Sequence, residues 1–78
     1  MKTFKITING IVQGVGFRPF VAELAKKLNI LGSVRNSSGT VIVLAQSSEN
    51  IIDTFFQKIK NENPIGSHIL NINVAEQE

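Results

Sequence analysis

The sequence predicts one small α+β domain in which the elements follow the order β-α-β-β-α-β. Four segments show the alternation or the β-branched composition of strands, and two show the apolar spacing of amphipathic helices. The chain has only 78 residues, so residues 1–78 are expected to fold around one core. No linker, internal repeat or low-complexity segment divides them.

The first two elements are a strand and a helix. Residues 4–9 alternate between apolar and polar types, as in a strand with one buried face, and Gly10 is expected to end this strand. The alternating apolar residues are Phe4, Ile6 and Ile8. A helix is predicted from Phe17 to about Asn29. Pro19 lies in its first turn, where proline loses no hydrogen bond because backbone N–H groups there have no preceding helical carbonyl. Its apolar stripe consists of Phe17, Val21, Leu24, Ala25 and Leu28.

A hairpin is predicted next. Gly32 introduces a short strand over residues 33–36, and the turn Ser37-Ser38-Gly39 leads into a strand over residues 40–46. Residues 40–45 are apolar on both faces and rich in β-branched types, so this strand is expected at the centre of the sheet.

The last two elements are a helix and a strand. Ser47 or Ser48 is expected to cap a helix whose apolar residues recur at four-residue spacing, and Pro64 lies just past its end. These apolar residues are Ile51, Phe55 and Ile59, joined by Ile52 and Phe56. A final strand is indicated by the alternation of Leu70, Ile72 and Val74 with Ile69, Asn71 and Asn73. The whole order predicts a ferredoxin-like fold, a four-stranded antiparallel sheet with two helices on one face.

The composition excludes several classes of site and partner. Of the residues, 42% are hydrophobic and 18% charged, which is typical of a globular domain. The absence of cysteine rules out disulfides, thiolate metal sites and cysteine nucleophiles. A net charge of +2 is too small to indicate nucleic acid or membrane partners, and the start of the chain resembles no signal peptide. We expect a cytoplasmic protein that is monomeric as an isolated domain.

The segment between the first strand and the first helix carries the strongest functional signal. Its glycines permit positive φ and let backbone N–H groups approach a ligand, and the start of a helix adds partial positive charge. Arg18 can bond two phosphate oxygens at once. A phosphate-binding loop is therefore predicted, although a plain tight connection with a solvated Arg18 also fits these residues. The predicted loop residues are Gln13, Gly14, Val15, Gly16, Phe17 and Arg18.

Residues 12–20, VQGVGFRPF, resemble the phosphate-binding signature of the acylphosphatase family. Residues 32–36 followed by 39–41 resemble the family's second motif, at the family's spacing. The resemblance implies that Arg18 binds the substrate phosphate and that Asn36 orients the attacking water. It also implies hydrolysis of acyl phosphate or carbamoyl phosphate without a metal or other cofactor. Taken alone, Asn36 is better explained as a turn residue of the hairpin, and the preference is reversed only by the loop sequence and its spacing from Arg18.

Proline directly after Arg18, followed by Phe20, is similar to one branch of this family. That branch is the N-terminal acylphosphatase-like domain of the HypF-type carbamoyltransferases, which mature nickel-iron hydrogenases. The resemblance implies that further domains of a longer carbamoyltransferase chain are candidate partners. A free-standing acylphosphatase is the alternative.

Three positions depart from the family pattern. Ser33 stands where tryptophan is common, Ser47 replaces a frequent glycine, and the turn from Asn36 to Gly39 is one residue shorter than usual. Because two of these changes flank Asn36, a module that binds or channels carbamoyl phosphate without hydrolysing it stays open as a second function.

Other functional classes find little support in the sequence. His68 is the only histidine and has no neighbouring ligand set, so no metal site is predicted. The carboxylates show no evident pair for acid and base catalysis, and the third strand lacks the aromatic residues that RNA-binding sheets use. These carboxylates are Glu23, Glu49, Asp53 and Glu62.

Overall fold

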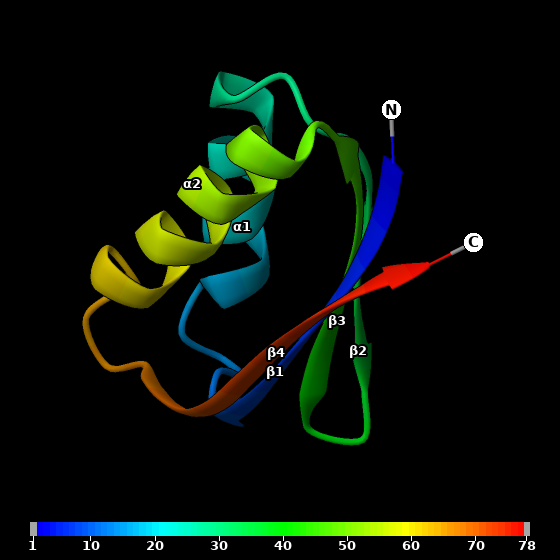
Figure 1. The fold of residues 1–78 in the computed structure, drawn as a ribbon. Coiled ribbons are helices and arrows are strands. Elements are labelled where there is room, and N and C mark those ends of the chain that lie inside the picture. Colours follow the sequence, from blue (N-terminus) through cyan, green and yellow to red (C-terminus); the bar gives the residue numbers. More distant parts are fainter. Residues whose placement is uncertain (1, 78) are drawn as a thin grey trace.

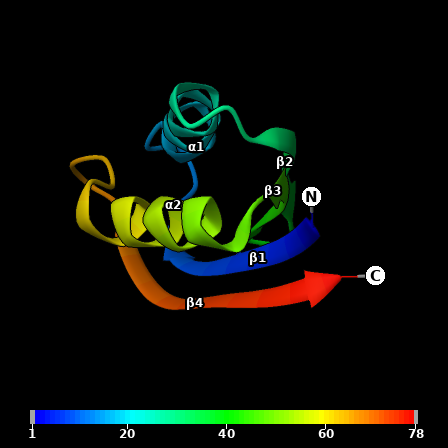
Figure 2. The same cartoon turned by 45° about the horizontal axis from the view of Figure 1, so that its top comes forward.

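The computed structural model describes residues 2–77 and contains the six elements in the predicted order (Figure 1). The strands are β1 (Lys2–Ile11), β2 (Leu31–Ser37), β3 (Thr40–Ser47) and β4 (His68–Gln77), and the helices are α1 (Phe17–Lys27) and α2 (Glu49–Asn61). The strands form one antiparallel sheet in the order β2-β3-β1-β4. Both helices lie on the same face of this sheet (Figures 1 and 2). The predicted ferredoxin-like fold is therefore confirmed.

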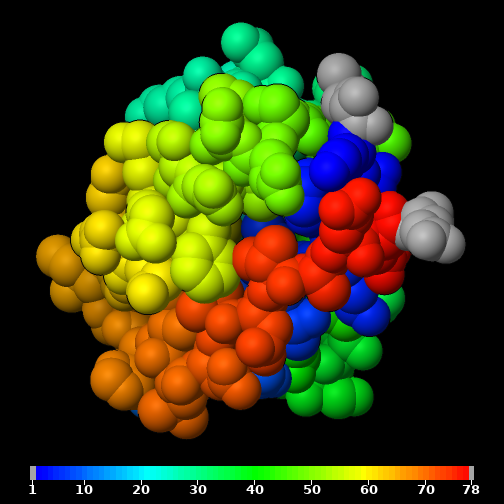
Figure 3. All heavy atoms as spheres, viewed as in Figure 1, coloured from blue at the N-terminus to red at the C-terminus, as the bar shows by residue number. Residues whose placement is uncertain are grey.

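The hydrophobic core fills the space between the sheet and the two helices. Alternate residues of the two central strands point into it, and the helices contribute their apolar stripes. The strand residues are Phe4, Ile6, Ile8, Val41, Val43 and Ala45, and the buried helix residues are Phe17, Val21, Leu24, Ile52, Phe55 and Ile59. The central position predicted for residues 40–45 is confirmed, since β3 pairs with β2 on one side and with β1 on the other. Figure 3 shows α2, its connection to β4 and β4 itself making up most of one face of the molecule.

The strand β4 departs from strict alternation. Asn9 pairs with Asn71 but Gly10 pairs with Ile69, so Leu70 is an extra residue in the ladder. As a result Ile69 packs against the core, whereas the side chain of Leu70 is 73% exposed. The predicted end of the first strand at Gly10 was also wrong, because pairing continues to Ile11.

The end of α1 sets the course of the chain into β2. The helix ends at Lys27, two positions before the predicted Asn29, and Asn29 takes a left-handed conformation with φ 57°. The N–H of Ile30 bonds the carbonyl of Ala25 at 2.9 Å, and the N–H of Asn29 bonds that of Lys26 at 3.1 Å. These two bonds form a Schellman motif, which satisfies the last helical carbonyls and turns Ile30 inward.

The hairpin between β2 and β3 is tighter than predicted. Ser37 pairs with Thr40 inside the ladder, so the turn consists only of Ser38 and Gly39, both with positive φ. This is the geometry of the two-residue turns that suit the twist of a hairpin. Asn36 consequently lies within β2 and not in the turn, which removes the turn interpretation of this residue. At the start of α2 the cap is Ser48, whose side chain accepts a hydrogen bond from the Ile51 N–H at 3.4 Å.

Candidate active site

The loop between β1 and α1 is an exposed backbone segment held between two buried side chains. Val12 is 2% exposed and Phe17 1%, so both ends of the loop are fixed in the core. Gly14 and Gly16 between them have φ values of 70° and 76°, in the left-handed region that favours glycine. A Cβ built at either glycine meets no atom within 4 Å. These glycines are therefore required by the backbone conformation and leave open space in front of the loop.

The start of α1 offers backbone donors to this space. Gly16 caps the helix without any side-chain hydrogen bond, and Phe17 and Arg18 have no preceding helical carbonyl for their N–H groups. Pro19, the next residue, has no N–H. The Phe17 side chain is buried, so only its backbone can face a ligand. Two N–H groups and the positive end of the helix thus face the open space in front of the loop.

A hydrogen bond joins this loop to the second motif. Gln13 Nε2 donates to Asn36 Oδ1 at 2.7 Å, across 23 positions of sequence. Asn36 pairs with Val41, whose side chain is buried under the helices, so Asn36 lies on the helix side of the sheet. The structure therefore brings Gln13 and Asn36 together. The sequence offered no specific signal for this contact.

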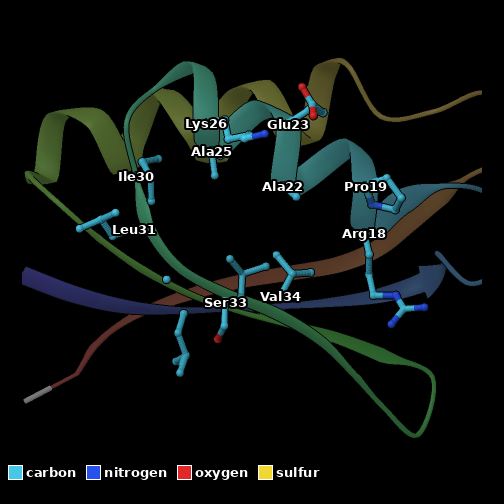
Figure 4. A pocket seen from close by; sticks show the side chains of 13 residues that line it. Arg18, Pro19, Ala22, Glu23, Ala25, Lys26, Ile30, Leu31, Ser33 and Val34 are labelled. Carbon is cyan, nitrogen blue, oxygen red and sulfur yellow. The ribbon is translucent and has the colours of Figure 1, made fainter.

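The side chain of Arg18 extends from the first turn of α1 toward the sheet (Figure 4). It is exposed and lines one end of a groove between α1 and β2, which we call the α1–β2 groove. Residues that line this groove include Arg18, Ala22, Ala25, Ile30, Gly32 and Val34. Val34 and Asn36 alternate with Arg35 along β2, so they share the helix-side face. The loop, Arg18 and Asn36 thus lie at the same end of the groove.

Among the other polar residues considered from the sequence, Glu23 lines the α1–β2 groove, whereas Glu62 and His68 do not. Glu62 bonds Lys58 at 3.2 Å and Glu76 lies 3.6 Å from Lys2, both pairs at the surface. His68 is exposed at the start of β4. Within residues 2–77 no group of three or more His, Cys, Asp or Glu side chains is arranged to hold a metal ion. In the same residues neither helix has the length and apolar character needed to cross a membrane.

A family model described as Acylphosphatase matches residues 4–78. The chain belongs to the acylphosphatase family. An acylphosphatase from Methanospirillum hungatei is 37% identical over 79 residues, with 100% of this chain and 87% of that protein covered. The crystal structure of acylphosphatase from Bacillus subtilis superposes with a TM-score of 0.93 at 38% identity, and 100% of this chain and 87% of that one are covered. The resemblance inferred from the two motifs is confirmed.

The HypF branch is also represented among the relatives of this acylphosphatase domain. A probable carbamoyltransferase HypF from Methanocaldococcus jannaschii is 42% identical over 72 residues. The match covers 92% of this chain but only 9% of that protein. The chain is therefore similar both to free-standing acylphosphatases and to one small domain of a much longer protein.

Proposed function

We propose that this acylphosphatase domain hydrolyses acyl phosphates, carbamoyl phosphate included, at the junction of the β1–α1 loop, α1 and β2. The observation that carries the proposal is the hydrogen bond between Gln13 and Asn36, which joins the phosphate-loop motif to the second motif in one constellation. Family membership supports the reaction type, since the matching model and the Methanospirillum relative are both named for it.

The phosphoryl group is held by the backbone of the loop and by Arg18. The N–H groups of Phe17 and Arg18 and the helix N-terminus supply fixed dipoles, and the guanidinium supplies the formal charge. Because these donors are already in place before the substrate arrives, they stabilise charge on the phosphoryl oxygens as it develops. No metal is needed in this scheme, because a carboxylate is a good leaving group.

Water is held by the pair of amides. With Oδ1 of Asn36 bonded to Gln13, Asn36 keeps its N–H donors free and Gln13 keeps its carbonyl oxygen free. A water that accepts from Asn36 and donates to Gln13 retains one lone pair for attack on phosphorus. Neither amide is a strong base, so the pair acts by positioning the nucleophile.

The reaction is a displacement at phosphorus. The water oxygen bonds to phosphorus as the bond from phosphorus to the bridging oxygen breaks, and the carboxylate or carbamate leaves with that electron pair. One water proton passes to a phosphoryl oxygen of the substrate itself. The products are the carboxylate or carbamate and inorganic phosphate, with all charge changes on the phosphoryl group facing Arg18 and the loop N–H groups.

Arg18→Ala tests the proposal directly. We expect the wild-type chain to hydrolyse acetyl phosphate in the presence of a chelator, and Arg18→Ala to lower kcat/KM by about 100-fold or more, because it removes the charged group that faces the phosphate. The matched control is Arg35→Ala, since Arg35 pairs with Ile42 on the opposite face of the same strand. Full activity in Arg18→Ala, or equal losses in the two variants, contradicts the assignment.

A second function is favoured by the HypF relative, in which a domain of this kind forms 9% of a carbamoyltransferase. In that case the site binds carbamoyl phosphate for another domain and does not complete hydrolysis. An NMR titration with inorganic phosphate separates the two functions. Shifts at Gly14, Gly16 and Arg18 without turnover of acetyl or carbamoyl phosphate would favour the binding module over the hydrolase.

A further inference from the structure

The α1–β2 groove has a volume of about 640 Å³, and apart from Arg18 at one end its lining has no part in the chemistry described so far. Binding sites for small molecules span roughly 300–1,000 Å³, so the groove is large enough to receive a substantial part of a ligand. It lies between one helix and the edge strand of the sheet (Figure 4).

Small residues on its facing walls create the groove. Ala22 and Ala25 on α1 carry side chains of a single carbon, and Gly32 on β2 carries none. Gly32 is required for a separate reason, because its φ is 150° and a Cβ there would collide with the backbone carbonyl of Leu44 on the neighbouring strand β3. Ile30 at 8% exposure and Val43 at 2% add buried apolar walls, whereas Leu31, also in the lining, is 61% exposed.

The groove is continuous with the phosphate site. Arg18 lines it at the N-terminal end of α1, and Val34, another lining residue, is two positions from Asn36 on the same face of β2. Two residues of a strand span about 7 Å, which is within reach of a group attached to a bound phosphoryl. A ligand whose phosphate contacts Arg18 can therefore extend along the strand into the groove.

The lining points to an uncharged, apolar ligand group. Most of the residues that line the groove are aliphatic or glycine, and besides Arg18 the polar ones are Glu23, Lys26 and Ser33. The charged residues along the helix, Glu23 and Lys26, have opposite signs, so the groove has no net charge there to attract an ionic group. An acetyl or carbamoyl group has too few atoms to occupy this space.

We propose that the α1–β2 groove binds the acyl group of the substrate and that the chain prefers acyl phosphates with an aliphatic acyl group of about six carbons over acetyl and carbamoyl phosphate. This inference rests on the proposed function, because it assigns the phosphate to Arg18 and the loop. Burial of each methylene against aliphatic walls strengthens binding, here by about tenfold in total, since the groove is open on one side.

Unreactive phosphonates test the groove without any turnover. Hexylphosphonate and methylphosphonate carry the same charged head and differ only in the alkyl chain. We expect hexylphosphonate to bind about tenfold more tightly and to shift the NMR signals of Ala22, Gly32 and Val34, while both compounds shift Gly14 and Gly16. Equal affinities, or no shifts in the groove, overturn the inference whether or not the chain hydrolyses acyl phosphates.

Kinetics with a homologous series test it on the reaction. Acetyl, butanoyl and hexanoyl phosphate release carboxylates of similar basicity, so a rise of about tenfold in kcat/KM along the series reports acyl binding. Ala22→Phe fills the groove from the exposed side of α1 and should abolish this rise. Lys27→Phe adds the same ring to an exposed residue of α1 that does not line the groove, and should preserve it.

The outcomes separate this inference from the proposed function. Hydrolysis of all three substrates with equal kcat/KM leaves the hydrolase in place and overturns the acyl preference. If the wild-type chain hydrolyses none of the three but binds hexylphosphonate more tightly than methylphosphonate, the hydrolase function is contradicted and the groove assignment is supported. Groove signals that shift on dilution of the protein alone would show that a second copy covers the groove, and would also overturn the inference.

Discussion

At the scale of single residues, the contact between Gln13 and Asn36 matters most for function. The sequence predicted that both belong to the site, but not that one bonds the other, because no spacing rule relates a loop residue to a strand residue 23 positions away. The phosphate-binding loop could be predicted because its glycines and Arg18 lie in one short segment, and their properties do not depend on distant residues. The contact depends on where β2 lies relative to the loop, which only the assembled sheet determines.

Single and double substitutions of Gln13 and Asn36 should show that their effects on kcat are coupled. We expect Asn36→Ala to lower kcat for acetyl phosphate by about 100-fold, the loss typical of one positioned group in a preorganised site. Gln13→Ala should lower it by about tenfold, and the double variant should lose little beyond Asn36→Ala, because Gln13 can only help to hold a water that Asn36 also binds. Asn61→Ala, at the exposed end of α2, is the control. Strictly additive losses in the double variant would show that the two amides act independently.

At the scale of elements, prediction was accurate where apolar periodicity is strong and failed where backbone geometry decides. Both helices and all four strands were found from their side-chain patterns. The extra residue Leu70 in β4 was missed, because a bulge leaves no mark on an alternating sequence. The Schellman end of α1 was placed two residues late, since Asn29 fits a helical pattern but takes the left-handed conformation.

Alanine substitutions at Gly32 in β2 and Gly14 in the β1–α1 loop compare the cost of a side chain at two positive-φ positions. Gly32→Ala should lower the free energy of unfolding by about 2 kcal/mol or more, because its Cβ meets the Leu44 carbonyl in addition to the unfavourable φ. Gly14→Ala should cost only about 1 kcal/mol, because the space around it is open and the backbone term acts alone. Urea denaturation of both variants measures the difference. Equal losses would mean that β2 moves away from β3 without penalty.

At the scale of the whole molecule, one core between sheet and helices stabilises the fold without disulfides. A chain of 78 residues has a free energy of unfolding of roughly 4–12 kcal/mol by the usual value per residue. A core substitution that leaves one large cavity would therefore remove much of this stability. This part was largely predictable, because apolar periodicity had marked the buried residues of β1 and the buried Phe55 and Ile59 of α2. The groove between α1 and β2 was not, since the small size of Ala22 and Ala25 shows an open space only once β2 is placed opposite them.

Two adjacent phenylalanines of α2 differ in burial, so their substitution compares the stability contributed by core packing with that from a surface contact. Phe55 is completely buried, whereas Phe56 is half-buried beneath the Lys60 ammonium, 5.4 Å from its ring centre. Phe55→Ala should lower the unfolding free energy by about 3–5 kcal/mol, and Phe56→Ala by about half as much or less. Chemical denaturation followed by circular dichroism measures both. A larger loss at Phe56 would contradict the assignment of the core.

The pairing of β1 with β4 brings Thr3 opposite Gln77, whereas the loop that follows β1 lies at the far end of that strand. A short flexible linker between these two residues would therefore close the backbone into a ring without passing near Arg18. New ends opened at the exposed Ile65-Gly66 segment would leave every strand and helix intact. We therefore expect a chain permuted at this segment to fold into the same structure, because no strand or helix is cut.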